Sequence, residues 1–174
     1  MIDPFQKDKP LDNSSLQNQL SILRLLLENL ETVYGLRPEQ AVLLLEQPNT
    51  PYIPISIFST GKLTVLEAIV KFLSEKRQKK YTEIAKLLKR SPRSMWGCFK
   101  LSSKKFRFAL PEDSALGYIS LQEFSSELTP TESLVYHLKE RNGWSLTRIS
   151  DFLKKNQRTI WALYNRASKK RASA

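Results

Sequence analysis

The chain has 174 residues, 41% of them hydrophobic, and a net charge of +11 at neutral pH. These values are compatible with one medium domain or two to three small ones, each with a packed core. The single cysteine, Cys98, excludes an intrachain disulfide and suits a reducing interior. Because the first residues are polar and the apolar runs are short, neither a signal peptide nor a membrane-spanning segment is expected.

A long amphipathic helix is predicted near the N-terminus, after a disordered tail over residues 1–12. Asp12 or Asn13 can cap this helix, which should run to about Tyr34. Its apolar residues follow the 4-3 spacing of a heptad seam. The seam residues, which are the dimerisation candidates, are Leu16, Leu20, Leu23, Leu27 and Leu30. Packing on the chain's own core and formation of a homodimer explain this seam equally well.

A second helix is predicted over residues 38–46, between Gly35, which suits a helix end, and the proline-rich break that follows. The two helices would form a hairpin domain over residues 13–50. Its acidic charge argues against DNA contact and favours a protein partner, such as a second subunit or a component of the transcription machinery.

The rest of the chain contains an internal duplication, which we call repeat 1 (residues 63–105) and repeat 2 (residues 128–170). A shift of 65 positions aligns them without a gap, and 15 of the 43 aligned pairs are identical. Each repeat follows a similar lead-in segment, 52–59 and 118–125, in which an alternating pattern predicts a short strand. The predicted domains are therefore residues 51–105 and 106–174.

Each repeat is predicted to form three helices. The first begins at a capping box, Thr64 with Glu67 and Thr129 with Glu132. The second is short, and a tight polar turn leads to the third helix, which Ser91 or Asn156 can cap. The expected fold class is mainly α: an N-terminal helical hairpin, then two tandem three-helix helix-turn-helix units with short extended lead-in segments.

Each unit resembles the region-4 helix-turn-helix of bacterial sigma factors and its relatives. The residues that carry this resemblance are Leu63–Glu67, Thr82–Ala85, Ser91 and Met95 in repeat 1, and Leu128–Glu132, Ile149, Asn156, Ile160 and Ala167–Lys170 in repeat 2. Ser150 departs from the family's alanine, and Trp96 and Trp161 occupy a slot that is often polar. The resemblance implies duplex-DNA binding. It does not imply a sigma factor, because no other sigma region is visible.

The positive charge is concentrated on the repeats. Residues 63–110 carry 13 Lys or Arg against 3 Asp or Glu, residues 111–174 carry 10 against 7, and residues 1–62 carry 5 against 7. A basic segment that coincides with a helix-turn-helix pattern is the electrostatic footprint expected of a nucleic-acid-binding protein. Solubilising lysines are the alternative explanation.

The third helix of such a unit enters the major groove, so its outward residues are the candidate DNA contacts. These candidates are Arg93, Ser94, Lys100, Gln157, Arg158, Thr159, Asn165 and Arg166. Arg93 and Arg158 share one slot, where an arginine can pair with guanine or bind phosphate. Gln157 and Asn165 suit adenine, which indicates that repeat 2 reads sequence more than repeat 1 does. The candidate phosphate contacts are Lys89, Arg90, Lys104, Lys105, Lys154, Lys155, Lys169 and Lys170.

Trp96 and Trp161 fall at one slot, so they should share a role. Packing under the lead-in segment is the favoured interpretation, and stacking on nucleic acid or on the other repeat is the alternative. His137 and Cys98 are expected to be partly buried structural residues. Neither a metal site, a cofactor site nor a catalytic constellation is expected.

The sequence thus predicts a cytoplasmic, nucleoid-associated protein that binds double-stranded DNA, and most simply a transcriptional regulator. Two alternatives stay open: a sequence-tolerant architectural DNA binder, and a protein-interaction module of the transcription machinery. RNA binding fits the basic helices and aromatics too, although no single-strand-binding signature is present. If both units engage one duplex, the site should be bipartite, with halves about one helical turn apart.

Overall fold

The computed structural model describes residues 13–34, 38, 41, 51–125 and 127–173. In them the chain is mainly helical, which confirms the predicted mainly α class. The elements, with η for 3-10 helices, are α1 (Asn13–Tyr34), β1 (Tyr52–Pro54), η1 (Ile55–Thr60), α3 (Val65–Glu75), α4 (Tyr81–Leu87), α5 (Pro92–Lys105), η2 (Ser114–Leu116), β2 (Tyr118–Ser120), η3 (Leu121–Ser125), α6 (Pro130–Glu140), α7 (Leu146–Leu153) and α8 (Gln157–Ala172).

Two predictions for the N-terminal region lie largely outside the described residues. The tail over residues 1–12 is one of them. The second helix of the hairpin is the other, although Pro38 and Ala41 are described and both are helical. The first helix has the predicted extent, Asn13 to Tyr34.

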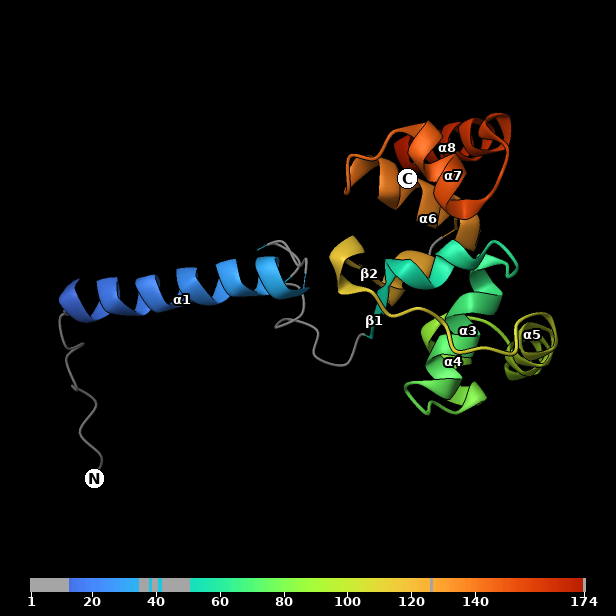
Figure 1. Cartoon of the computed structure of the whole chain (residues 1–174), viewed down its shortest axis with the longest axis horizontal. Coiled ribbons are helices and arrows are strands. Elements are labelled where there is room, and N and C mark those ends of the chain that lie inside the picture. The colour runs from blue at the N-terminus through green and yellow to red at the C-terminus, as the bar shows by residue number, and fades with distance from the viewer. Residues whose placement is uncertain (1–12, 35–37, 39–40, 42–50, 126, 174) are drawn as a thin grey trace, which may run out of the picture.

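Helix α1 extends away from the body formed by the two repeats, and it contacts η2 of that body (Figure 1). Most of its apolar side chains are consequently open to solvent, with exposed fractions from 38% at Leu16 to 66% at Leu25, whereas Leu27 and Leu30 are half-buried. The interpretation in which α1 packs on the chain's own core is wrong for Leu16, Leu20 and Leu23, which are exposed, but not for the end of the helix, where Leu27 and Leu30 are half-buried. The physical reason is that the helix projects beyond the repeats, so most of its length has no neighbour in the described structure.

The predicted start signals of the repeats are confirmed. Thr64 accepts a hydrogen bond from the amide of Glu67 at 3.3 Å, and the Glu67 carboxylate accepts one from the amide of Thr64 at 2.8 Å. Thr129 and Glu132 form the same box at the start of α6. These reciprocal bonds satisfy amides that have no partner inside the helix. The first helix of each repeat therefore begins at the same position.

The lead-in segments differ from the prediction. The strand in each is only three residues long, Tyr52–Pro54 and Tyr118–Ser120, and a 3-10 helix follows it. All six residues from Ile53 to Phe58 are buried, which a strand with one solvent-facing side would not allow. Ser56 is buried because its hydroxyl donates to the Pro111 carbonyl and accepts from the Asp113 amide, each at 2.9 Å.

The two repeats are related by an internal pseudo-two-fold axis. Strands β1 and β2 pair antiparallel, with Ile53 opposite Ile119, its own counterpart in the other lead-in segment. The flanking backbone bonds are equivalent: the Ile55 amide donates to the Gly117 carbonyl, and the Leu121 amide donates to the Pro51 carbonyl, both at 3.1 Å. Further contacts are reciprocal, since η1 packs on α7, η3 packs on α4, and α3 packs on α6.

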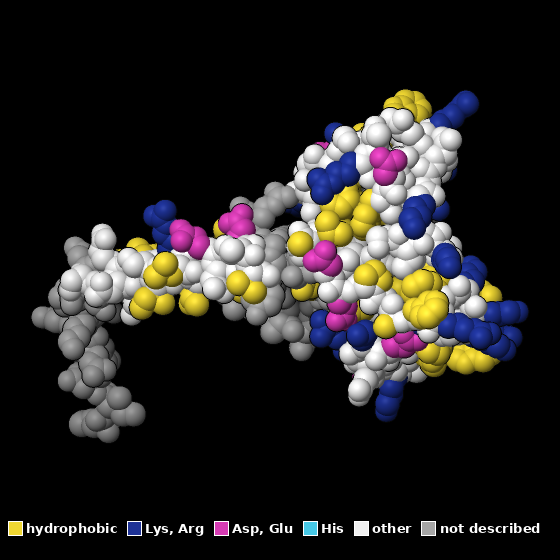
Figure 2. All heavy atoms as spheres, viewed as in Figure 1, with side chains coloured by type: hydrophobic (Ala, Val, Ile, Leu, Met, Phe, Trp, Pro, Cys, Tyr) yellow, Lys and Arg dark blue, Asp and Glu magenta, His cyan; other side chains and the backbone are white. Residues whose placement is uncertain are grey.

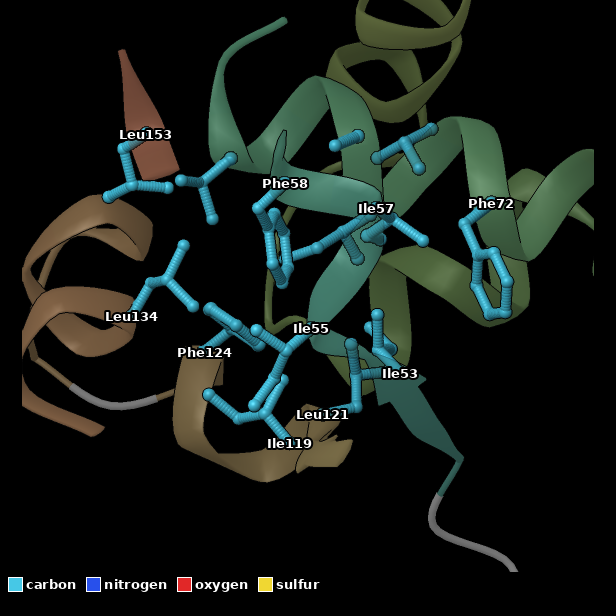
Figure 3. Close-up of a cluster of buried hydrophobic side chains, with 14 of the residues drawn as sticks. Ile53, Ile55, Ile57, Phe58, Phe72, Ile119, Leu121, Phe124, Leu134 and Leu153 are labelled. Carbon is cyan, nitrogen blue, oxygen red and sulfur yellow. The ribbon is translucent and has the colours of Figure 1, made fainter. Parts of the chain in front are cut away.

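One hydrophobic core spans both repeats. Figure 3 shows Phe58 and Phe124, from the two lead-in segments, pointing toward each other, and their ring centroids lie 6.0 Å apart. Around them the core collects apolar side chains from the lead-in segments and from both repeats. Because the lead-in segments fill the space between the repeats, the predicted boundary at 105/106 divides the sequence but does not divide the core.

A candidate nucleic-acid interface

The third helices, α5 and α8, have an inner face that fixes them on the core and an outer face that meets solvent. In α5, Met95 and Ser102 are fully buried, and in α8 Ile160, Leu163 and Ala167 are buried. The outer positions follow the helical spacing of three or four residues. They are Arg93, Gly97, Lys100 and Lys104 in α5, and Arg158, Ala162, Asn165 and Lys169 in α8, all of them exposed or half-exposed. We call these two sets the outer faces.

The turn before each third helix holds its N-terminus in the same way in both repeats. Lys89 and Lys154 adopt positive φ values of 51° and 50°, so each reverses the chain with one left-handed residue. The caps then act as predicted: the Ser91 hydroxyl accepts from the Ser94 amide at 3.3 Å, and the Asn156 side chain accepts from the Arg158 amide at 2.8 Å. Arg93 and Arg158 thus follow a fixed turn by the same number of residues.

The remaining predicted contacts near these N-termini are also exposed. Ser94 and Thr159 occupy equivalent slots, and both are open to solvent. The Gln157 side chain donates to the Thr147 hydroxyl of α7 at 3.1 Å. This bond orients the amide of Gln157 and couples it to α7.

Three of the predicted DNA-contacting cations form ion pairs within the protein. Lys105 lies 2.6 Å from the Glu67 carboxylate, and Lys170 lies 3.0 Å from the Glu132 carboxylate. Arg166 pairs with the same Glu132 at 3.4 Å. These pairs join the last part of each third helix to the capping box of the first helix. Any phosphate contact by Lys105, Lys170 or Arg166 therefore competes with a bond that supports the fold.

Both capping glutamates are held in the charged form. Burial by itself raises the pKa of Glu67, but the hydrogen bonds from Lys105 and from Thr64 outweigh it and leave the pKa below its ordinary value. Burial likewise raises the pKa of Glu132, and the bonds from Thr129 and Lys170 reverse that effect. Both carboxylates are nearly inaccessible, with side-chain exposures of 6% and 3%. The same electrostatic support is therefore built into both repeats.

The cations at the other predicted DNA and phosphate contacts do not form ion pairs with carboxylates of the described residues. In the part of the chain that the structure describes, no ion pair includes the cations of the turns or the outer faces. These cations are Lys89, Arg90, Arg93, Lys100, Lys104, Lys154, Lys155, Arg158 and Lys169. The stem of Lys154 also lies against Gly61, where an added Cβ would stand 2.6 Å from the lysine Cδ. Figure 2 shows the Lys and Arg side chains gathered on the body of the repeats, with few on α1.

The favoured interpretation of the paired tryptophans is wrong. Trp96 and Trp161 are 52% and 58% exposed, so they do not pack under the lead-in segments. The inner slots beside them are already filled by Met95 and Ile160, which leaves each indole on the flank of an outer face. The ammonium of Lys100 lies over the Trp96 ring, 5.1 Å from its centroid. An exposed aromatic beside free cations is suited to contact with a nucleic acid.

The single histidine and the single cysteine are structural residues, buried and half-buried respectively. His137 is 6% exposed and occupies the slot of the buried Phe72. Cys98 is half-buried, and burial together with the nearby Glu67 charge raises the pKa of its thiol, which disfavours a reactive thiolate. Among the described side chains, no group of three His, Cys, Asp or Glu residues is placed to hold a metal ion.

No protein-family model matches this chain, and no curated protein or solved structure matches it either. The resemblance to sigma region 4 consequently rests on the quoted residues alone and stays a prediction. Within the described ranges, no helix combines the length and the apolar character needed to cross a membrane.

Proposed function

We propose that this protein binds double-stranded DNA through the outer faces of α5 and α8 and acts as a sequence-preferring regulator of transcription. The observation that carries the proposal is the duplicated interface. The third helix of each repeat, α5 or α8, is fixed by a buried inner face. On its outer face each helix presents an arginine at the same slot, followed by a small residue and further polar or cationic groups. A helix of this kind, with its N-terminus held by a tight turn, is suited to the major groove.

The two outer faces favour different contributions. The α5 face is cationic, with Arg93, Lys100 and Lys104, and cations of this kind bind phosphates and position a protein without reading sequence. The α8 face combines Arg158 with Asn165, an amide that can pair with adenine. Repeat 2 is therefore the main reader of sequence in this proposal, and repeat 1 supplies more of the affinity.

The exposed tryptophans favour nucleic acid over a purely protein-binding role. A protein-interaction face is usually depleted of lysine at its centre. Here Trp96 lies beneath the Lys100 ammonium, and the exposed Trp161 is on the helix that carries Arg158. This combination supports contacts to phosphates, with the indole against a sugar or base. An architectural DNA binder with no sequence preference is the second candidate, favoured by the basic charge of repeat 1.

Helix α1 is proposed to pair with α1 of a second copy. In its leucine seam, Leu16, Leu20 and Leu23 are exposed, and Leu27 and Leu30 are half-buried. The charged residues of α1 are Arg24, Glu28 and Glu31, of which the first two pair with each other at 3.1 Å. A seam with so little charge is compatible with an identical partner. In sedimentation of the full chain, Leu20→Glu with Leu23→Glu should give monomers where the parent chain dimerises, whereas Asn18→Glu should not. A parent chain that stays monomeric at high concentration would contradict the pairing.

The test of DNA binding is fluorescence anisotropy of the full chain on a random-sequence duplex across a salt series. About 6–10 phosphate contacts would weaken binding by roughly 10³–10⁵ between about 50 and 200 mM salt. The Arg93→Ala/Arg158→Ala variant should flatten that dependence only slightly, because two contacts of many are removed. Absence of binding at low salt would overturn the proposal and leave protein interaction as the function to pursue.

A further inference from the structure

The pseudo-two-fold axis has a consequence for the kind of DNA site that one chain can occupy. The axis passes between Ile53 and Ile119, which are each other's counterparts and pair directly. On both sides of it the same contacts recur: α3 holds α5, α6 holds α8, and each lead-in 3-10 helix packs on the second helix of the other repeat. Helices α5 and α8 are thus related by a rotation, as in a two-fold dimer, and not by a translation along the chain.

Duplex DNA has matching symmetry. Two-fold axes perpendicular to the helix axis exchange its antiparallel strands, so a two-fold protein meets equivalent groups on a site whose halves are inverted. Direct repeats would instead require units related by translation and by rotation about the DNA axis. We infer that a single chain binds an inverted repeat in one duplex, with α5 on one half-site and α8 on the other. This inference rests on the proposed function.

The outer faces also predict how far the inverted repeat departs from perfect symmetry. Arg93 and Arg158 occupy equivalent slots behind equivalent turns, so they contact the same base in both half-sites. Lys100 and Asn165 are equivalent in position but differ in chemistry, and so do Leu101 and Arg166. The half-sites are therefore alike where the arginines bind, near the N-termini of the helices, and differ where the later turns contact the duplex.

The experiment is selection of binding sites from a pool of random duplexes by the full chain, followed by the mass of the complex on the enriched sequence. The expected result is an inverted repeat with unequal halves, bound at one duplex per chain; with excess duplex, a dimer paired through α1 would carry two duplexes. When the two half-sites are rearranged as a direct repeat at the same spacing, affinity should fall at least about tenfold, because the second unit no longer docks within the same complex.

Other outcomes separate the inference from the proposed function. Enrichment of a direct repeat or of a single half-site, or saturation at one inverted repeat for every two chains, would overturn the inference and leave DNA binding intact. Strong, salt-dependent binding with no enriched sequence would overturn it as well, in favour of the architectural role. No binding to any duplex would overturn the proposed function itself.

A matched pair of variants tests the assignment of halves. Asn165→Lys gives α8 the side chain that α5 carries, and Lys100→Asn makes the reverse change; both positions are on the outer faces, away from the core. Each variant should select a more symmetric site. In Asn165→Lys both half-sites should resemble the one that α5 binds in the parent chain, and in Lys100→Asn both should resemble the one that α8 binds. A selected site that keeps the parent asymmetry in both variants would contradict the assignment.

Discussion

Repeat 1 and repeat 2 share an inner frame and differ on their outer faces. Several single bonds of the frame recur, since the Glu67–Lys105 pair is repeated as Glu132–Lys170 and both turns use a lysine with positive φ. The outer faces have diverged, as Lys100 against Asn165 illustrates. The difference separates the slots that are constrained by a shared symmetric core from the slots that are free to vary.

The largest expected effect comes from breaking the frame at its axis. Ile53→Ala should lower the free energy of unfolding by about 2–5 kcal/mol, because the side chain is fully buried and leaves a cavity. Ile119→Ala should cost a similar amount. Since the two residues pair directly, their double variant should deviate from additivity. Urea unfolding measures all three variants.

The control for this prediction is Phe108→Ala, because Phe108 is 74% exposed and its loss should change stability by no more than about 0.5 kcal/mol. If Ile53→Ala costs no more than this control, or if the two repeats unfold in separate transitions, the shared core is not what holds the repeats together.

The next effect concerns the shared arginine slot. Arg93→Ala and Arg158→Ala should each weaken specific binding by about 1–3 kcal/mol if the guanidinium reads a base. Arg158→Ala should also relax sequence preference more, because Asn165 makes repeat 2 the proposed reader. Competition between the selected site and random duplex measures both quantities. Equal losses on both kinds of DNA would assign the arginines to phosphates.

A smaller effect is a pH dependence built into both repeats. The folded-state pKa values of Glu67 and Glu132 lie below the ordinary value of 4.5. The contribution of these carboxylates to the free energy of unfolding is therefore complete above that pH and is lost as the pH falls through the folded-state values. Glu67→Gln should cost about 1–2 kcal/mol at neutral pH, through the weakened capping box and ion pair.

Thermal unfolding from pH 7 to pH 3 measures that prediction, with Glu132→Gln as its counterpart in repeat 2. The stability of the Glu67→Gln/Glu132→Gln variant should depend less on pH than that of the parent chain. An identical acid dependence in the two proteins would show that other carboxylates are responsible.

The smallest effect lies at the centre of the outer faces, where Gly97 and Ala162 are equivalent. Nothing lies within 4 Å of a Cβ built on Gly97, and its φ is not in the left-handed region. Gly97→Ala should therefore stabilise the protein by about 0.5–1 kcal/mol, since glycine is unfavourable inside a helix. Ala162→Gly should do the opposite. Destabilisation by Gly97→Ala in thermal unfolding would contradict the open environment.

Local signals in the sequence were sufficient for the helix starts. Capping boxes at Thr64 and Thr129, and the caps Ser91 and Asn156, depend on residues two or three positions away, and the structure contains all four. The inner face of α5, marked by Met95, also follows from helical spacing. Elements defined by neighbouring residues are thus readable before any tertiary contact is known.

Features that join distant residues were not predictable in this way. The Lys105–Glu67 pair spans 38 positions, and the pairing of β1 with β2 depends on how the repeats meet. The lead-in segment alternates as a strand would, yet both of its sides are buried between the repeats, and most of it forms a 3-10 helix. The exposure of Trp96 follows from occupancy of the inner slots, which composition does not reveal.

In the proposed function, DNA binding is localised on the outer faces and is not a general effect of positive charge. This claim is tested by comparing two variants of equal charge change on the same random duplex at one salt concentration. Lys100→Glu/Lys104→Glu alters the α5 outer face, and Lys62→Glu/Arg141→Glu alters exposed cations outside α5 and α8. Localised binding predicts that the first variant loses at least about tenfold more affinity than the second. Equal losses would contradict the claim.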